Sequence, residues 1–163
     1  WTYNLPEAQL DRFLMKVKVD YVSKENEILM YKNSLNQNDV KNVINIEDIF
    51  FLQNLLNDIY VSEKIYDYVY SIVDATRNPD LYWLNDLKNY IEFWVWPRWA
   101  LWLIQSWTVS AILNNRSFLI PEDIIDNVYN VLGHRIILSY EAIADNINSK
   151  DLLSKIISNI KIV

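Results

Sequence analysis

The stretch "EFWVWPRWALWLIQSW", residues 92–107, decides the fold class of this chain. It holds five of the seven tryptophans in the 163-residue sequence. Its single basic residue, Arg98, directly follows Pro97 and is the only charged residue as far as Leu113. Proline suits the first position of a helix. We therefore expect a helix over 97–113 that is apolar nearly all round, and such a helix is either buried on most sides or forms an interface.

One face of this expected helix is rich in indole rings. Trp99, Trp102, Leu103 and Trp107 follow each other at helical spacing on that face. If the face is open to solvent, its area exceeds what monomeric proteins usually expose, and the chain self-associates through it. One arrangement open to Arg98 is a cation–π stack, with its guanidinium lying on a neighbouring indole ring.

Composition narrows the class of protein further. The only glycine is Gly133, whereas about 7% glycine is usual. Sandwiches and Rossmann domains need many turns with positive φ, so a helical bundle is favoured, and glycine-rich phosphate loops are excluded. The absence of cysteine and the single histidine exclude disulfides, thiolate nucleophiles and histidine-rich metal sites. A net charge of −6 argues against general nucleic-acid binding.

Targeting signals are also missing from the printed sequence. The first residues, "WTYNLPEAQLDRF", contain no apolar signal core, and no apolar run reaches the length of a membrane span. We expect a soluble, cytoplasmic protein that binds neither membranes nor nucleic acid.

Hydrophobic periodicity predicts helices along most of the chain. Pro6 and Glu7 suit the start of a short helix over 5–14. Helices are also expected over 24–35, 46–61, 63–77, 97–113, 121–132, 139–147 and 149–160. Gly133 is expected to end or kink the helix over 121–132. The segment "MKVKVDYV", residues 15–22, alternates like a half-buried strand. A lone strand cannot satisfy its backbone, so its partners are expected outside this chain or in a second copy.

The remaining polar residues have structural explanations. Acidic pairs such as Glu122 and Asp123 lie in first helical turns, where they compensate the helix dipole. His134 precedes Arg135 and an apolar run, as a structural histidine would. The residues alone thus predict a mainly α domain with one orphan strand and no self-contained active site.

Three blocks resemble the MoxR family of AAA+ ATPases. The first block, "LPEAQLDRFLMKVKVDY", resembles the segment that follows sensor 1 in that family. The second, "PRWALWLIQS…NNRSFLIPEDI", resembles the sensor-2 helix and the helix after it. The third, "VLGHRIILSYEAIADNI", resembles the closing block of the family. The resemblance covers nearly the whole chain. It implies that residues 1–22 are the end of the ATPase core, that residues 23–163 are the helical lid, and that the orphan strand pairs into the core sheet.

The resemblance also implies roles for particular residues. Arg12 matches the arginine finger, which reaches the nucleotide of a neighbouring subunit, and Arg98 matches the sensor-2 arginine at the nucleotide of its own subunit. Pro97 accompanies Arg98 at the cofactor-binding position. The parent protein would use ATP and Mg²⁺, assemble as a hexameric ring with its upstream ATPase core, and work with von Willebrand factor A-domain proteins. This chain alone lacks the Walker motifs and should be inactive.

The tryptophans depart from the family pattern. Trp94 and Trp96 stand where the family has glycine and serine, and those at 99, 102 and 107 stand at alanine or similar positions. Large residues at small buried positions cost stability unless the core repacks. This suggests altered residue identities, or indoles that fill the nucleotide space. The alternative function is an autonomous or engineered interaction module that binds a partner through its tryptophan-rich helix.

Overall fold

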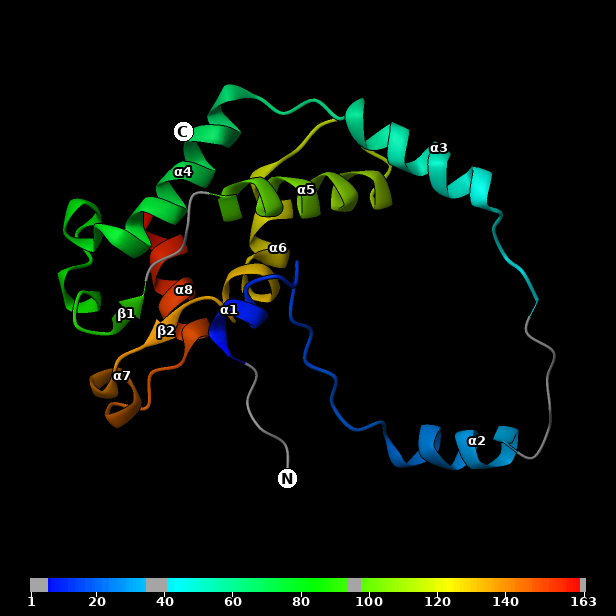
Figure 1. Ribbon diagram of the computed structural model, residues 1–163, viewed down its shortest axis with the longest axis horizontal. Helices are drawn as coiled ribbons and strands as arrows, with labels where there is room; N and C mark the ends of the chain where they lie inside the picture. The colour runs from blue at the N-terminus through cyan, green and yellow to red at the C-terminus, as the bar shows by residue number, and fades with distance from the viewer. Residues whose placement is uncertain (1–5, 35–40, 94–97, 162–163) are drawn as a thin grey trace. The chain divides into compact units, whose positions relative to one another are not determined.

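The computed structural model describes residues 6–34, 41–93 and 98–161 (Figure 1). The chain divides into two compact units, one formed by Trp1–Lys16 with Leu56–Val163 and the other by Val17–Leu55. The predicted boundary between residues 22 and 23 stays a prediction. Trp1, Trp94, Trp96 and Pro97 lie outside the described residues.

The smaller unit contains α2 (Lys24–Ser34) and most of α3 (Ile46–Asn57), as periodicity predicts. The hydroxyl of Ser23 accepts from the Asn26 backbone N–H at 3.4 Å, and the Asp48 carboxylate accepts from the Asn45 backbone N–H at 2.8 Å. These bonds satisfy backbone donors at the two helix starts. Neither helix buries a residue.

Residues 15–22, the predicted strand, form no regular secondary structure here. The expected pairing of this segment with a sheet outside the chain stays a prediction. Among the described residues, the segment forms a single backbone hydrogen bond, from the Lys16 N–H to the Asn130 carbonyl at 2.8 Å. No strand in the described part of the chain pairs with the segment. Alternation alone cannot make a strand, since the ladder needs a partner.

The larger unit is built on four helices. These are α4 (Glu63–Arg77), α5 (Arg98–Leu113), α6 (Pro121–Leu132) and α8 (Ser149–Asn159). Helix α5 packs against α4 and α6, and α8 packs against the same two helices (Figure 1). Shorter elements complete the unit: α1 (Glu7–Leu10), η1 (Pro79–Tyr82), η2 (Asn85–Leu87) and α7 (Tyr140–Ala144). The mainly α fold class is therefore confirmed.

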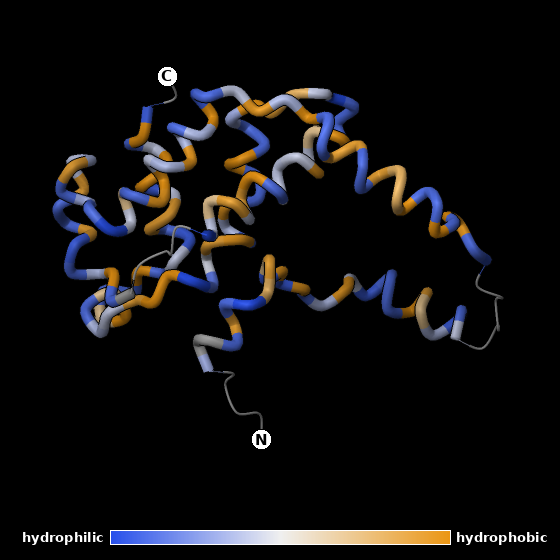
Figure 2. Tube along the Cα trace, turned by 45° about the horizontal axis from the view of Figure 1, so that its top comes forward, coloured by the Kyte–Doolittle hydropathy of each residue, from blue (hydrophilic) through white to orange (hydrophobic). Residues whose placement is uncertain are grey.

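Apolar side chains from the four helices form one core. Apolar residues recur along these helices with polar residues between them, which is the pattern of helices with one buried face (Figure 2). Fully buried members include Ile72, Leu103, Trp107, Ile124, Leu132, Leu152 and Ile156. Among the described residues, no helix is long and apolar enough to cross a membrane.

The indole face of α5 turns inward. Trp99 is 4% exposed and Trp107 is fully buried, while Trp102 is half-buried. A fully open patch of these three indoles is therefore wrong for this structure, and the self-association expected from such a patch is not tested. The interaction-module alternative stays a prediction. The exposed side of α5 carries Leu101 and Val109 instead.

A two-stranded antiparallel sheet was not predicted. Strand β1 (Ile91–Phe93) pairs with β2 (Ile137–Leu138), with Ile91 opposite Leu138 and Phe93 opposite Ile137. The backbone N–H of Ser139 extends the pairing by donating to the Tyr90 carbonyl at 3.0 Å. The sheet holds the segment that follows α6 beside the segment that leads toward α5.

The start of α6 is fixed by a buried ion pair. Arg116 grips both carboxylate oxygens of Asp123, with Nη1 donating to Oδ2 at 2.7 Å and Nη2 to Oδ1. The same carboxylate accepts from the Ile120 backbone N–H at 3.1 Å. The Asp123 side chain is only 3% exposed. Asp123 therefore does more than compensate the helix dipole.

Candidate functional site

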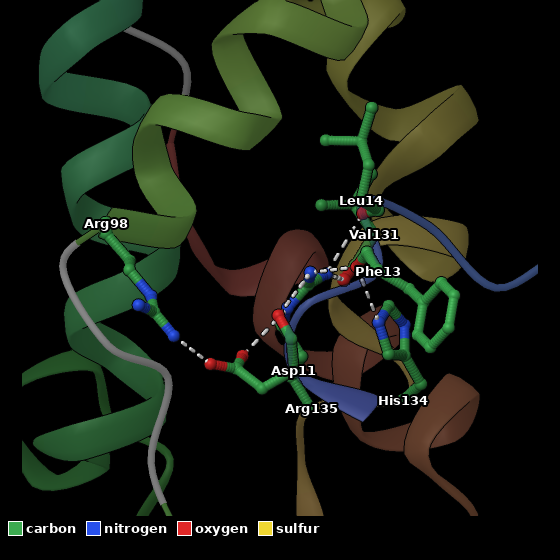
Figure 3. A network of polar contacts seen from close by, with 7 residues as sticks. All are labelled: Asp11, Phe13, Leu14, Arg98, Val131, His134 and Arg135. Carbon is green, nitrogen blue, oxygen red and sulfur yellow. Dashed lines mark hydrogen bonds and ion pairs between the residues drawn. The ribbon is translucent and has the colours of Figure 1, made fainter. Parts of the chain in front are cut away.

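Three segments far apart in sequence meet at one cluster of polar residues (Figure 3). They are the turn over residues 11–14 after α1, the first residue of α5, and residues 134–135 after α6. Helix α6 ends at Leu132 and Gly133 caps it, so the chain leaves the helix at His134 and Arg135. A Cβ at Gly133 would lie 2.5 Å from the Tyr129 carbonyl oxygen, which explains glycine at this exit.

Asp11 shares its carboxylate between two arginines. Its Oδ2 forms an ion pair with Nη2 of Arg98, and its Oδ1 lies 3.4 Å from Nε of Arg135. The side chain of Asp11 is 18% exposed, that of Arg135 is fully buried, and that of Arg98 is 59% exposed. One carboxylate thus joins a buried cation to an accessible one (Figure 3).

Arg135 fastens the turn to the helical core through backbone carbonyls. Its Nη1 donates to the Leu14 carbonyl at 3.1 Å and to the carbonyl of Val131. Its Nη2 donates to the Phe13 carbonyl and, at 3.4 Å, to the Asp11 carbonyl. Burial lowers the pKa of the Arg135 guanidinium, and the charge of Asp11 opposes this effect. A buried charge of this kind is tolerated because its donors are satisfied.

Two indole rings surround the guanidinium groups. The Arg135 guanidinium carbon lies 4.5 Å from the centre of the Trp102 ring and 5.4 Å from that of Trp99. The Arg98 guanidinium carbon lies 5.7 Å from the Trp102 ring centre. These are cation–π distances. The stacking of Arg98 on a neighbouring indole, expected as one possibility, is thus what the structure shows.

Arg12 lies between the anchored residues of the turn. The predicted helix over 5–14 ends earlier, at Leu10. Arg12 therefore lies in a turn, where its backbone N–H donates to the Gln9 carbonyl at 3.3 Å. Its side chain is exposed and makes no hydrogen bond or ion pair with any residue that the structure describes. The backbone on either side of Arg12 is held, while its guanidinium is left available.

His134 supports the same turn as a structural residue. Its Nε2 lies 3.3 Å from the Phe13 carbonyl oxygen. Burial, followed by the nearby charge of Arg135, lowers the pKa of the imidazole. A neutral ring that donates to a carbonyl agrees with the structural role expected for this histidine. No group of three or more acidic, histidine or cysteine side chains in the described segments could hold a metal ion.

The structure therefore brings two of the predicted site residues to one place. Arg98 contacts Asp11, which directly precedes Arg12. Pro97 lies outside the described residues. Sequence reasoning missed Asp11 and Arg135. The sequence marks these two residues only weakly. Asp11 belongs to a charged pair in "LDRF", and Arg135 stands at the start of an apolar run in "HRII".

Comparisons with known proteins agree with this architecture. Residues 86–156 match the family model of the AAA lid domain. The chain is 34% identical over 159 residues to Chaperone MoxR1 of Mycobacterium tuberculosis, covering 97% of this chain and 42% of that protein. It is 31% identical over 164 residues to the uncharacterized protein YeaC of Bacillus subtilis, covering 99% of this chain and 48% of that protein.

A solved structure shows the same fold. A crystal structure of a protein from Cytophaga hutchinsonii, assigned as an ATPase, superposes with a TM-score of 0.92 at 35% sequence identity. The match covers 99% of this chain and 50% of the other. The chain thus spans half or less of the length of these relatives.

Proposed function

We propose that this chain, which belongs to the MoxR family of AAA+ ATPases and carries the AAA lid domain, supplies two arginines to ATP hydrolysis in a ring-shaped assembly. Arg98 acts as the sensor-2 residue toward the nucleotide of its own subunit. Arg12 acts as the arginine finger toward the nucleotide of the adjacent subunit. The observation that carries the proposal is that Arg98 pairs with Asp11, the residue directly before Arg12, while the side chains of both arginines are exposed.

The chemistry of the two side chains suits this role. A guanidinium stays charged at all physiological pH values and offers a planar fork of donors to phosphate oxygens. Arg98 stands at the N-terminal end of α5, where the helix dipole also favours an anion. An arginine finger contributes about 10³–10⁵ in rate in GTPases, by stabilising charge on the transferred phosphoryl group.

The remaining parts of the proposal concern the whole protein. ATP and Mg²⁺ would be held by an ATPase core, with Arg98 and Pro97 next to the phosphates and Arg12 reaching a neighbour. ATP supplies the transferred phosphoryl group. The assembly would be a hexamer with a chaperone-like role in the cytoplasm, acting with von Willebrand factor A-domain proteins. The 163-residue chain alone should not hydrolyse ATP.

A mixing experiment tests both assignments together. Arg12→Ala and Arg98→Ala are each made in the intact ATPase, with Lys88→Ala as a control at an exposed cation that pairs with Asp80. We expect each arginine variant to lose at least about tenfold in kcat, by analogy with other arginine fingers, and the lysine variant to match the wild type.

Mixing the two inactive variants should restore part of the turnover. A subunit that lacks Arg12 still carries Arg98 at its own nucleotide, and its neighbour supplies the missing finger. Mixing either variant with itself restores nothing. Full turnover by the Arg12 variant, or no recovery on mixing, would contradict a finger that acts between subunits.

A further inference from the structure

Arg135 and Arg98 both pair with Asp11, but they differ in burial and in the number of their hydrogen bonds. Arg135 is fully buried and also donates to the carbonyls of residues 11, 13, 14 and 131. Arg98 is 59% exposed, and among the described residues its only polar partner is Asp11. An incoming anion can therefore remove Arg98 from the cluster and leave the anchor of the turn in place.

We propose that Asp11 is a positioning residue that couples the state of Arg98 to the turn that carries Arg12. This inference rests on the proposed function of the two arginines. A phosphate group and the Asp11 carboxylate compete for one guanidinium. When the phosphate takes Arg98, Asp11 keeps only its bond to Arg135, and the carboxylate beside Arg12 loses half of its countercharge.

The geometry gives this exchange a direct route to Arg12. Asp11 and Arg12 are consecutive residues in a turn of four, and the backbone of that turn is fixed at residues 11, 13 and 14 by Arg135. A change in the pairing of Asp11 therefore acts next to Arg12, the charged residue of the turn whose side chain has no polar partner among the described residues. Nucleotide that binds Arg98 in one subunit would in this way alter the position of Arg12 in the same subunit. Arg12 is the arginine finger that reaches the nucleotide of the adjacent subunit.

Asp11→Asn in the intact ATPase separates this role from simple support. The amide keeps the size of the side chain and removes the charge that competes with phosphate. We expect ATP to bind about two- to fivefold more tightly, the size of effect typical of a solvent-accessible ion pair. We also expect kcat to fall, because the state of Arg98 no longer affects the turn that carries Arg12. Loss of mere structural support would instead weaken ATP binding and lower kcat together.

Two further variants complete the design. Asp11→Glu retains the charge and should recover most of the wild-type kcat and ATP affinity. Asp80→Asn removes an exposed carboxylate that pairs with Lys88 at 2.8 Å, and it should leave both quantities unchanged. The proposal is overturned if Asp11→Asn matches Asp80→Asn, or if its ATP affinity falls in step with kcat.

A measurement on the wild-type protein avoids dependence on the folding of any Asp11 variant. With ¹³C-labelled aspartate, the carboxyl resonance of Asp11 should shift when a non-hydrolysable ATP analogue binds, and Arg98→Ala should abolish that shift. An unmoved resonance at saturating analogue overturns the coupling.

The proposed function has its own separate failure. If Arg12→Ala and Arg98→Ala both retain full turnover, the roles of the arginines are wrong. If both arginine variants lose turnover while Asp11→Asn changes neither ATP affinity nor kcat, only the coupling is wrong.

Discussion

The guanidinium of Arg135 lies over the ring of Trp102, with its central carbon 4.5 Å from the ring centre. The same group donates to carbonyls of the turn over residues 11–14 and of Val131. An arginine that stacks and also satisfies several carbonyls cannot be replaced by a point charge. Arg135 is therefore the residue that joins the turn to the lid.

Replacing Arg135 should destabilise the chain strongly. Arg135→Ala leaves Asp11 without its buried partner and leaves carbonyls unsatisfied, so we expect a loss of about 3–5 kcal/mol in the free energy of unfolding. Arg135→Lys should recover little of this, because an ammonium cannot make the planar fork. Urea unfolding of the 163-residue chain measures both values.

Arg98→Ala is the matched control for that prediction. It removes the other, 59% exposed partner of Asp11, and we expect it to cost less than about 1 kcal/mol. Equal costs at the two arginines would contradict the division into an anchor and a releasable partner.

The tryptophans of α5 should contribute as core residues. Trp107 is fully buried and its indole nitrogen has no partner among the described residues, so its contribution is apolar packing. Trp107→Ala should cost about 3–5 kcal/mol, as for other buried aromatic truncations. Trp83→Ala, at an 85% exposed indole, should change stability by less than about 0.5 kcal/mol. A small loss at Trp107 would mean that the core collapses around the missing ring.

Local signals account for the parts of the fold that the sequence predicted. Pro121 and the acidic residues behind it mark the start of α6, and Gly133 marks its end. The strand over 15–22 is not formed here for the opposite reason, since its alternation is local but its stability depends on a partner. The β1–β2 pair was missed because strands of three and two residues are too short to show a period.

The site was only half visible in the sequence. Arg12 and Arg98 were found through family motifs, whereas Asp11 and Arg135 had no local pattern to mark them. Their contact joins residues 124 positions apart. Residue type favours solvent for both charged side chains, and only the tertiary structure shows that one of them is fully buried.

The ion pair at the start of α6 should be a second point of sensitivity. Asp123 is almost fully buried and accepts from Arg116 and from the Ile120 backbone N–H. Asp123→Ala should therefore cost about 3 kcal/mol or more in the free energy of unfolding. Glu122→Ala alters the neighbouring exposed carboxylate of the same helical turn and should cost only a few tenths of a kcal/mol, about the size of a dipole effect. Thermal unfolding of both variants compares the two, and similar losses would show that the dipole alone explains the acidic pair.

His134 should make the stability of the chain depend on pH in a defined window. Burial and the charge of Arg135 lower the pKa of the folded imidazole below its ordinary value of 6.5. The unfolded chain therefore binds more protons between the two pKa values, so the stabilisation is complete above pH 6.5 and is lost as the pH falls toward the folded pKa. Because the chain has one histidine, His134→Gln should remove this component alone. The test compares urea unfolding at about pH 7.5 and about pH 5.5. We expect the wild type to lose more stability on acidification than the variant does. Equal losses in the two proteins would show that carboxylates cause the whole effect.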